Sequence, residues 1–246
     1  MMLLAIDCGN SRLKWGVCRC GPQQDINWLA QGALPYADLA GFAEILRAQP
    51  RAERAVVANV AGSVVADVII ATLDALNLPV IWAHGQSEQC GVRNLYDQPQ
   101  QLGADRWAAL IGARHLHRGP CLVVSAGTAT TADVLDAEGV FQGGLILPGI
   151  ELMLKALAQN TAQLPLAQGR FTGLPRNTAD AIASGCLHAQ VGAIERMYAQ
   201  VAALDNSACI ITGGGAGQFF DLLRIPKHRV DNLVLEGVAR IGISAD

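Results

Sequence analysis

Apolar runs separated by short polar turns dominate the N-terminal half of the chain. Apolar runs of four to eight residues bounded by turns are typical of buried strands, and longer periodic stretches indicate helices. The run Leu3-Leu4-Ala5-Ile6, for example, ends at Asp7 and a glycine-bearing turn. By this pattern the half is predicted to contain strands at 2–8, 13–20, 27–33, 55–60 and 80–82, and helices at 38–48, 63–76 and 103–117.

The C-terminal half repeats the order of strands and helices predicted for the N-terminal half. Gly185 and Gly192 lie inside its longest helix and predict close packing against a neighbouring backbone. Three meandering strands followed by alternating helices and strands, twice over, predict an α/β duplicated actin-like (ribonuclease H-like) ATPase fold, with halves 1–118 and 119–246 around a nucleotide cleft. The predicted elements are strands at 121–124, 130–136, 140–147 and 208–211, helices at 148–158, 178–203 and 235–243, and a helix and strand after the glycine-rich turn 213–217.

Composition narrows the class of protein. At 246 residues, with 51% hydrophobic and 16% charged residues, the chain can bury a substantial core. The net charge of −3 and the lack of a basic run argue against nucleic-acid binding. Without a long apolar stretch or leader pattern we expect a soluble cytoplasmic protein, not bound to a membrane, whose seven scattered cysteines are free thiols.

The turn after the first strand carries candidate phosphate ligands. It reads Asp7-Cys8-Gly9-Asn10-Ser11-Arg12-Leu13-Lys14. Backbone N–H groups freed by such a turn can face phosphate oxygens, Asn10 and Ser11 add polar side chains, and Lys14 adds a cation. Asp7 stands at the strand end, where a carboxylate can orient a magnesium ion or its waters. The turn therefore predicts a nucleotide phosphate site.

Two later turns bear on the same ligand. Val123-Val124-Ser125-Ala126-Gly127-Thr128-Ala129-Thr130-Thr131-Ala132-Asp133 is a partial echo of the first turn, which suggests two related halves closing on one ligand. Gly213-Gly214-Gly215-Ala216-Gly217 follows a strand and could let backbone approach a purine or ribose, although a purely structural turn has the same composition. Neither a Walker loop nor a Gly-x-Gly-x-x-Gly fingerprint occurs, which disfavours P-loop and Rossmann folds.

The segment 94–106 places an aspartate beside an arginine at a predicted helix start. It reads Asn94-Leu95-Tyr96-Asp97-Gln98-Pro99-Gln100-Gln101-Leu102-Gly103-Ala104-Asp105-Arg106. The partial positive charge of a helix N-terminus favours an anion. Asp105 is therefore a candidate general base and Arg106 a candidate clamp for an anionic substrate. An ordinary first-turn charge pair would look the same, and position alone does not separate the two interpretations.

Together these stretches resemble the type III pantothenate kinases, members of the acetate and sugar kinase, Hsp70 and actin superfamily. The turn 7–14 is similar to the family's first phosphate motif, segment 94–106 to its pantothenate motif, and Gly127-Thr128-Ala129 to its second phosphate motif. The resemblance covers essentially the whole length in the same order. Its further matches are Gly143–Gly149, Asn177–Ile182 with Gly185, and Thr212–Gly214.

The resemblance implies ATP-dependent phosphorylation of the 4′-hydroxyl of pantothenate, the first committed step toward coenzyme A. Asp105 would accept the hydroxyl proton, residues 7–14 and Thr128 would hold ATP, and Asp7 would lie near magnesium. The family's acceptor site lies at a two-fold dimer interface, so a homodimer is implied in which Thr178 reaches the substrate of the partner subunit. The other implied pantothenate contacts are Tyr96, Gly103, Ala104, Asp105 and Arg106.

One position departs from the family pattern. The second phosphate motif usually begins with an aspartate that ligates a required monovalent cation, and Ser125 stands there instead. Because a hydroxyl is a neutral and weaker ligand for a hard cation, we expect K⁺ or NH₄⁺ to bind weakly, or another group to supply the charge. Two alternatives stay open: another kinase or phosphatase of the superfamily, and a nucleotide-binding regulatory relative with little turnover. The retained family residues argue against the second; they are Asp7, Lys14, Asp105, Arg106 and Thr178.

Overall fold

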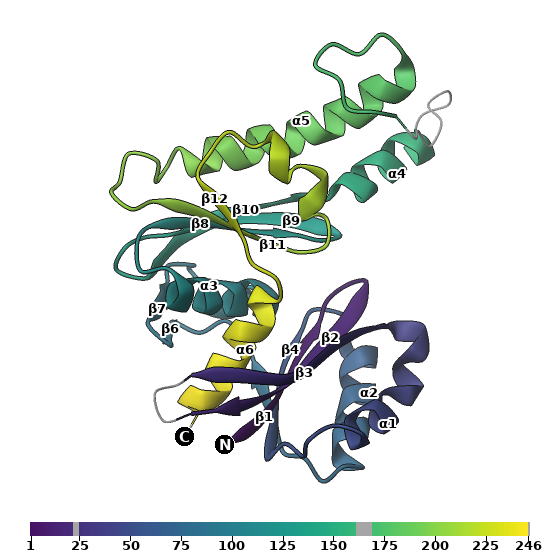
Figure 1. The fold of residues 1–246 in the computed structure, drawn as a ribbon, viewed down its shortest axis with the longest axis vertical. Coiled ribbons are helices and arrows are strands. Elements are labelled where there is room, and N and C mark those ends of the chain that lie inside the picture. The colour runs from purple at the N-terminus through teal and green to yellow at the C-terminus, as the bar shows by residue number, and fades with distance from the viewer. Residues whose placement is uncertain (22–24, 161–168, 246) are drawn as a thin grey trace. The chain divides into compact units, whose positions relative to one another are not determined.

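The computed structural model describes residues 1–21, 25–160 and 169–245, which form two compact units (Figure 1). The first unit contains residues 1–118, residues 139–141 and the C-terminal helix α6 (Leu233–Ser244). The second contains residues 119–138 and 142–231. The half predicted to begin at residue 119 includes α6, but in the structure this helix belongs to the first unit.

The first unit is built on a five-stranded sheet of order β3-β2-β1-β4-β5. The central strand β1 pairs antiparallel with β2 and parallel with β4, so the carboxyl ends of β1 and β4 meet at one edge. Its apolar side chains are buried on both faces, which explains the continuous hydrophobic run. The strands are β1 (Met2–Cys8), β2 (Arg12–Cys20), β3 (Ile26–Pro35), β4 (Arg54–Asn59) and β5 (Val80–Ala83).

Helices α1 (Phe42–Arg47) and α2 (Ser63–Asp74) cover one face of this sheet, and α6 lies on the other (Figure 1). Phe42 and Ile69, both buried, join the apolar strand residues in one core. Helix α6 also crosses α3 (Ala104–Leu116) at very short range. A side chain at Gly237 would strike the Ala108 carbonyl, and a Cβ at Gly112 would lie 2.6 Å from the Leu233 carbonyl oxygen.

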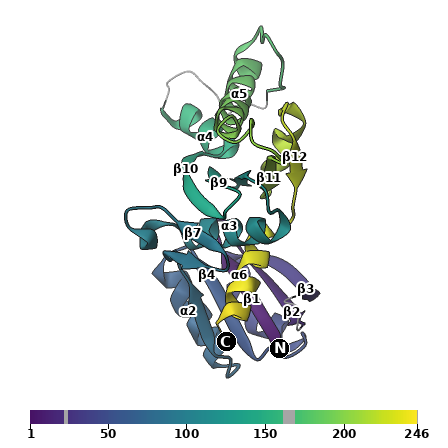
Figure 2. The same cartoon turned by 90° about the vertical axis from the view of Figure 1, so that its left-hand side faces the viewer.

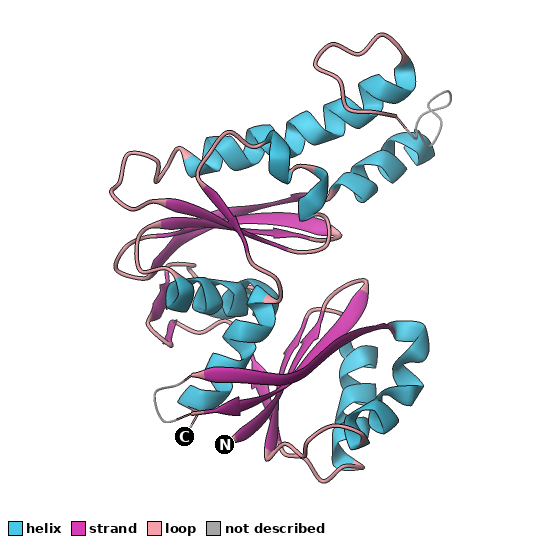
Figure 3. Cartoon of the chain, in the orientation of Figure 1, coloured by secondary structure: helices cyan, strands magenta, loops and turns pink. Residues whose placement is uncertain are grey.

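The second unit repeats the strand order of the first, as Figure 3 helps to follow: β10-β9-β8-β11-β12 corresponds to β3-β2-β1-β4-β5. Here β8 pairs antiparallel with β9 and parallel with β11, as β1 does with β2 and β4. This repetition confirms the predicted duplicated actin-like fold. The strands are β8 (Cys121–Ala126), β9 (Ala129–Leu135), β10 (Val140–Pro148), β11 (Ala208–Thr212) and β12 (Lys227–Arg229).

Helices α4 (Ile150–Asn160) and α5 (Thr178–Tyr198) pack on one face of the second sheet (Figure 2). Ile194 and Tyr198 of α5 are buried against Leu122 and Val124 of β8. Alternate residues of β8 point to the opposite face, so Ser125 is directed away from this core.

Some predicted elements differ from the structure. The helix predicted at 38–48 is a 3-10 helix, η1 (Tyr36–Gly41), followed by the short α1, and the long helix ends at Tyr198 rather than residue 203. The helix predicted after the glycine-rich turn is two 3-10 turns, η3 (Ala216–Gln218) and η4 (Phe220–Leu222). The short elements β6 (Glu88–Gln89), β7 (Val92–Asn94) and η2 (Pro99–Gln101) were not predicted.

The prediction that Gly185 and Gly192 pack closely against backbone is wrong. Among the described residues, a Cβ on either glycine would have no heavy atom within 4 Å apart from its own helix backbone and chain neighbours. The close helix contact is made instead by Gly112 and Gly237. Within the described ranges, every helix is too short or too polar to cross a bilayer.

Candidate active site

Asp7 is a buried carboxylate at the carboxyl end of β1. It lies directly opposite Lys14 of β2, and its side chain is only 8% exposed. Its Oδ1 atom has no hydrogen-bond partner among the described residues. Burial, reinforced by the negative charge of Asp105 and opposed by Lys14, raises the pKa of Asp7 from 3.8 to about 7. The raised pKa means that Asp7 lacks sufficient compensating positive charge.

The surroundings of Asp7 fit a magnesium ion held together with phosphates. The described residues contain no cluster of three or more His, Cys, Asp or Glu side chains that could hold a metal on their own. Mg²⁺ is commonly bound by one or two carboxylates, several waters and the phosphates of a nucleotide. An orphaned, buried carboxylate oxygen beside a turn of backbone amides is suited to that arrangement.

The turn between β1 and β2 is anchored from outside the hairpin. The Tyr36 hydroxyl donates a hydrogen bond to the Gly9 carbonyl, and the Val60 amide donates to the Cys8 carbonyl at 3.0 Å. Burial, with the nearby Asp7 charge, raises the pKa of the Cys8 thiol to about 12, so this thiol stays neutral. The predicted ligands Asn10, Ser11 and Arg12 are exposed at the surface of the turn.

Asp105 occupies the second residue of α3, whose N-cap is Gly103. Its Oδ1 accepts a hydrogen bond from the Arg106 amide at 2.8 Å, which satisfies one of the free N–H groups of the helix terminus. A Cβ at position 103 would lie 2.8 Å from the same Asp105 oxygen and 3.9 Å from Val60. Glycine at 103 therefore leaves the space that the carboxylate occupies.

Arg106 is buried and held in a fixed orientation. Its Nη1 donates to the Tyr96 hydroxyl at 3.0 Å, and its guanidinium carbon lies 5.7 Å from the Tyr96 ring centroid and 5.8 Å from that of Phe141. Asn94 in turn fixes Tyr96, since its Oδ1 accepts from the Tyr96 amide at 3.0 Å and its Nδ2 donates to the Pro99 carbonyl at 3.2 Å. The motif thus holds a buried guanidinium in one orientation, an arrangement suited to binding an anion.

The motif residues of the second unit lie at the carboxyl ends of β8 and β11. Ser125 pairs in register with Thr212 on one side and Thr131 on the other, so three hydroxyl side chains stand in a row. Thr131 Oγ1 is buried without a hydrogen-bond partner in the described structure. The Thr128 carbonyl accepts from the Gly149 amide at 2.9 Å, and Gly213 has a φ of +98°. A side chain at Gly213 would strike the Ala126 carbonyl.

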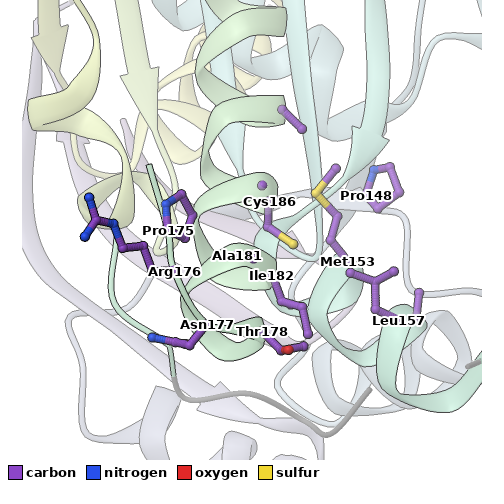
Figure 4. A pocket seen from close by; sticks show the side chains of 13 residues that line it. Pro148, Met153, Leu157, Pro175, Arg176, Asn177, Thr178, Ala181, Ile182 and Cys186 are labelled. Atoms are coloured by element: carbon purple, nitrogen blue, oxygen red, sulfur yellow. The ribbon is translucent and has the colours of Figure 1, made fainter. Parts of the chain in front are cut away.

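Thr178 begins α5 and is exposed beside an apolar cavity. Asn177 caps the helix by accepting from the Asp180 amide at 2.9 Å, and the Asp180 carboxylate accepts from Asn177 Nδ2 at 2.7 Å. Between α4 and α5 lies a cavity of about 890 Å³ into which Ile182 and Met153 point (Figure 4). Its other labelled lining residues include Leu157, Pro175 and Cys186.

Comparison with known proteins assigns the family. A model of the type III pantothenate kinase family matches residues 3–200. A type III pantothenate kinase from Aromatoleum aromaticum is 57% identical over 238 residues, which cover 97% of this chain and 96% of the relative. The chain belongs to the type III pantothenate kinase family. The resemblance inferred from the sequence motifs is thereby confirmed.

Solved structures agree at the level of the fold. A Campylobacter jejuni protein described as a Baf family transcriptional activator has a TM-score of 0.64 at 21% identity, covering 97% of this chain and 96% of that one. A 2-dehydro-3-deoxygalactonokinase-like protein from Sinorhizobium meliloti has a TM-score of 0.57 at 14% identity, covering 99% and 98%. These similarities support the actin-like fold of a type III pantothenate kinase.

The structure groups the predicted site residues of this pantothenate kinase family member by unit. The first unit brings the 7–14 turn and the 94–106 segment close enough for Asp7 and Asp105 to interact electrostatically. Ser125, Thr128 and Thr178 belong to the second unit. Sequence analysis missed Tyr36 and Phe141, which lie outside every motif and reach the site only through strand pairing.

Proposed function

We propose that this protein transfers a phosphoryl group from ATP to the 4′-hydroxyl of pantothenate, as its family membership implies. One observation carries the proposal: Asp105 interacts electrostatically with Asp7, while the adjacent Arg106 is locked by Tyr96 and Phe141. Phosphoryl transfer depends on positioning and charge neutralisation more than on covalent chemistry. In this proposal Arg106 positions the anionic acceptor, and the nearby Asp7 carboxylate holds the magnesium ion that neutralises charge.

Asp105 orients the acceptor hydroxyl in this proposal. A carboxylate is a weak base toward an alcohol, so it takes the proton late, as the bond to phosphorus forms. Arg106 holds the pantothenate carboxylate, assisted by Tyr96, Gly103 and Ala104. Burial of the guanidinium strengthens this pairing because water competes for it poorly.

The 7–14 turn and Thr128 hold ATP with its Mg²⁺ in this proposal. The orphaned Oδ1 of Asp7 supports the assignment of that side chain to magnesium, and Lys14 lies opposite it on the paired strand. When bound, the ion neutralises charge on the phosphates. The exposed side chains of Asn10, Ser11 and Arg12 lie in the turn that follows Asp7.

A monovalent cation binds weakly at Ser125 in this proposal. The hydroxyl row Thr212–Ser125–Thr131 offers neutral oxygens where the family pattern has an aspartate. Neutral ligands favour K⁺ or NH₄⁺ less than a carboxylate would. Half-maximal activity should therefore require a higher K⁺ concentration than in relatives carrying the aspartate; the same half-activating concentration would contradict this assignment.

The functional unit is a homodimer in the cytoplasm in this proposal, with Thr178 reaching the partner's site. The exposed position of Thr178 at the start of α5, beside the apolar cavity between α4 and α5, supports it. Exposed apolar side chains there, Leu157 and Leu174, would leave water on association. Sedimentation of the purified chain tests the dimer, and a monomer at assay concentration would contradict it.

The activity test is formation of phosphopantothenate from ATP, Mg²⁺ and pantothenate. Asp105→Asn should lower kcat by roughly 10²- to 10⁴-fold, because removing a general base costs about that much. Asp97→Asn is the matched control, since Asp97 is an exposed acid in the same segment. If the unaltered protein shows no turnover at any K⁺ or NH₄⁺ concentration but still binds ATP, the nucleotide-binding regulatory alternative is favoured.

A further inference from the structure

We propose that Tyr36 is a positioning residue for the phosphates of the nucleotide, acting through the peptide between Gly9 and Asn10. The inference rests on the proposed assignment of the 7–14 turn to ATP. Tyr36 stands directly after β3, and strand pairing places Pro35 beside Arg12 at the start of β2. This register brings an aromatic side chain distant in sequence to the turn that follows β1.

The hydrogen bond fixes the orientation of one peptide unit. The Tyr36 hydroxyl donates to the Gly9 carbonyl oxygen. A trans peptide is planar, and its C=O and N–H groups point in opposite directions. Holding the Gly9 carbonyl toward Tyr36 therefore directs the Asn10 N–H away from it. That N–H is one of the backbone donors expected to face phosphate.

The Tyr36 hydrogen bond restrains the turn from a residue outside it. Gly9 has no side chain and thus wide conformational freedom, and the next three side chains are exposed. Burial, with contributions from the Cys8 and Asp7 charges, raises the pKa of Tyr36 above its ordinary value. The phenol consequently remains a protonated donor at neutral pH. An N–H held in place before the ligand arrives binds phosphate without a cost of reorganisation.

The test compares Tyr36→Phe with Tyr198→Phe. Both changes delete one hydroxyl and keep the ring, and the Tyr198 hydroxyl contacts Ser207 in the second unit, 2.9 Å from its Oγ. In steady-state kinetics, Tyr36→Phe should raise KM for ATP about 3- to 10-fold, the effect of one net hydrogen bond. KM for pantothenate should stay unchanged. Tyr198→Phe should leave both KM values unchanged.

Two results would overturn the inference: an unchanged KM for ATP in Tyr36→Phe, or equal rises in both KM values. Lys14→Ala separates this failure from failure of the proposed function. If Lys14→Ala weakens ATP and Tyr36→Phe does not, only the role of Tyr36 is wrong. If neither variant weakens ATP, the assignment of the 7–14 turn is wrong. If Tyr36→Phe lowers the melting temperature, calorimetric titration with MgATP at low temperature compares the ATP affinities of the same variants.

Discussion

At the scale of one residue, Asp7 shows that a buried charge in the site lowers the stability of the folded protein. Its pKa of about 7 in the folded chain, against an ordinary 3.8, means that the native state binds this proton more tightly than the unfolded state. Stability therefore falls as pH rises from about 4 through about 7, and the full penalty of the buried charge remains above that range. A bound cation would offset the penalty.

Asp7→Asn should remove this pH dependence, because an amide resembles the protonated acid. Without divalent ions the variant should melt a few degrees above the unaltered protein at pH 8, with little difference at pH 4. Thermal melts at the two pH values measure the effect. Asp67→Asn, an exposed acid on α2, is the control. Identical pH profiles for Asp7→Asn and the unaltered protein would contradict the inferred cost.

Arg106→Lys tests the geometry of the clamp. A lysine keeps the charge but loses the planar fork that bonds Tyr96 and lies near two aromatic rings. We expect KM for pantothenate to rise about 10-fold or more, as when a charged hydrogen bond is lost, with a smaller change in KM for ATP. Arg93→Lys on β7 provides an exposed control. Equal kinetics in Arg106→Lys and the unaltered enzyme would exclude the clamp.

The relative positions of site residues were predictable from sequence where one motif contains both partners. Asp105 and Arg106 are neighbours at a helix start, so their relation can be read from the chain. Tyr36 and Phe141 could not be found this way, because each meets the site through a strand register that no local pattern encodes. That Asp7 Oδ1 is buried without a hydrogen-bond partner among the described residues was likewise not predictable, because it depends on how distant residues enclose the side chain.

At the scale of elements, helix glycines have two opposite roles. Gly112 of α3 and Gly237 of α6 allow close backbone contact, whereas a Cβ at Gly192 of α5 would meet no described residue outside its own helix within 4 Å. Sequence alone treated helix glycines as equivalent signals of close packing. Strands, by contrast, were predicted well because apolar runs such as that of β1 are buried on both faces. The 3-10 turns and the short strands β6 and β7 have no comparable periodicity.

Gly237→Ala should therefore destabilise the protein. The new methyl group would strike the Ala108 carbonyl, and overpacking of this kind costs about 1–3 kcal/mol. Roughly 2–4 °C of melting temperature is lost per kcal/mol in a chain of this size. Gly192→Ala is the matched control and should be neutral or stabilising by about 0.5–1 kcal/mol. Calorimetric melts of both variants decide, and equal melting temperatures would rule out the close crossing of α3 and α6.

At the scale of the whole molecule, chain connectivity and structural units do not coincide. The first unit takes α6 from residues that follow the second unit in the sequence. The sequence boundary at residue 118 could not reveal this, because the amphipathic pattern of α6 does not state which sheet it covers. Only its contacts with β1, β4 and α3 assign it.

Separated fragments test this arrangement. Residues 1–118 alone should remain unfolded, because the buried face that α6 covers would be exposed. The same fragment joined by a flexible linker to residues 232–246 should regain cooperative melting and native circular dichroism. Cooperative unfolding of 1–118 without the helix would show that α6 is dispensable, contrary to this expectation.

The return of α6 also has a consequence for synthesis of the protein on the ribosome. The segments with Asp7 and Asp105 emerge early, yet the helix that completes their unit leaves the exit tunnel only after the residues of the second unit. During most of translation these segments wait with an uncovered apolar surface, open to chaperones and proteases. Any premature stop codon, even one near residue 232, should therefore yield a chain that is degraded rather than one that is partly active.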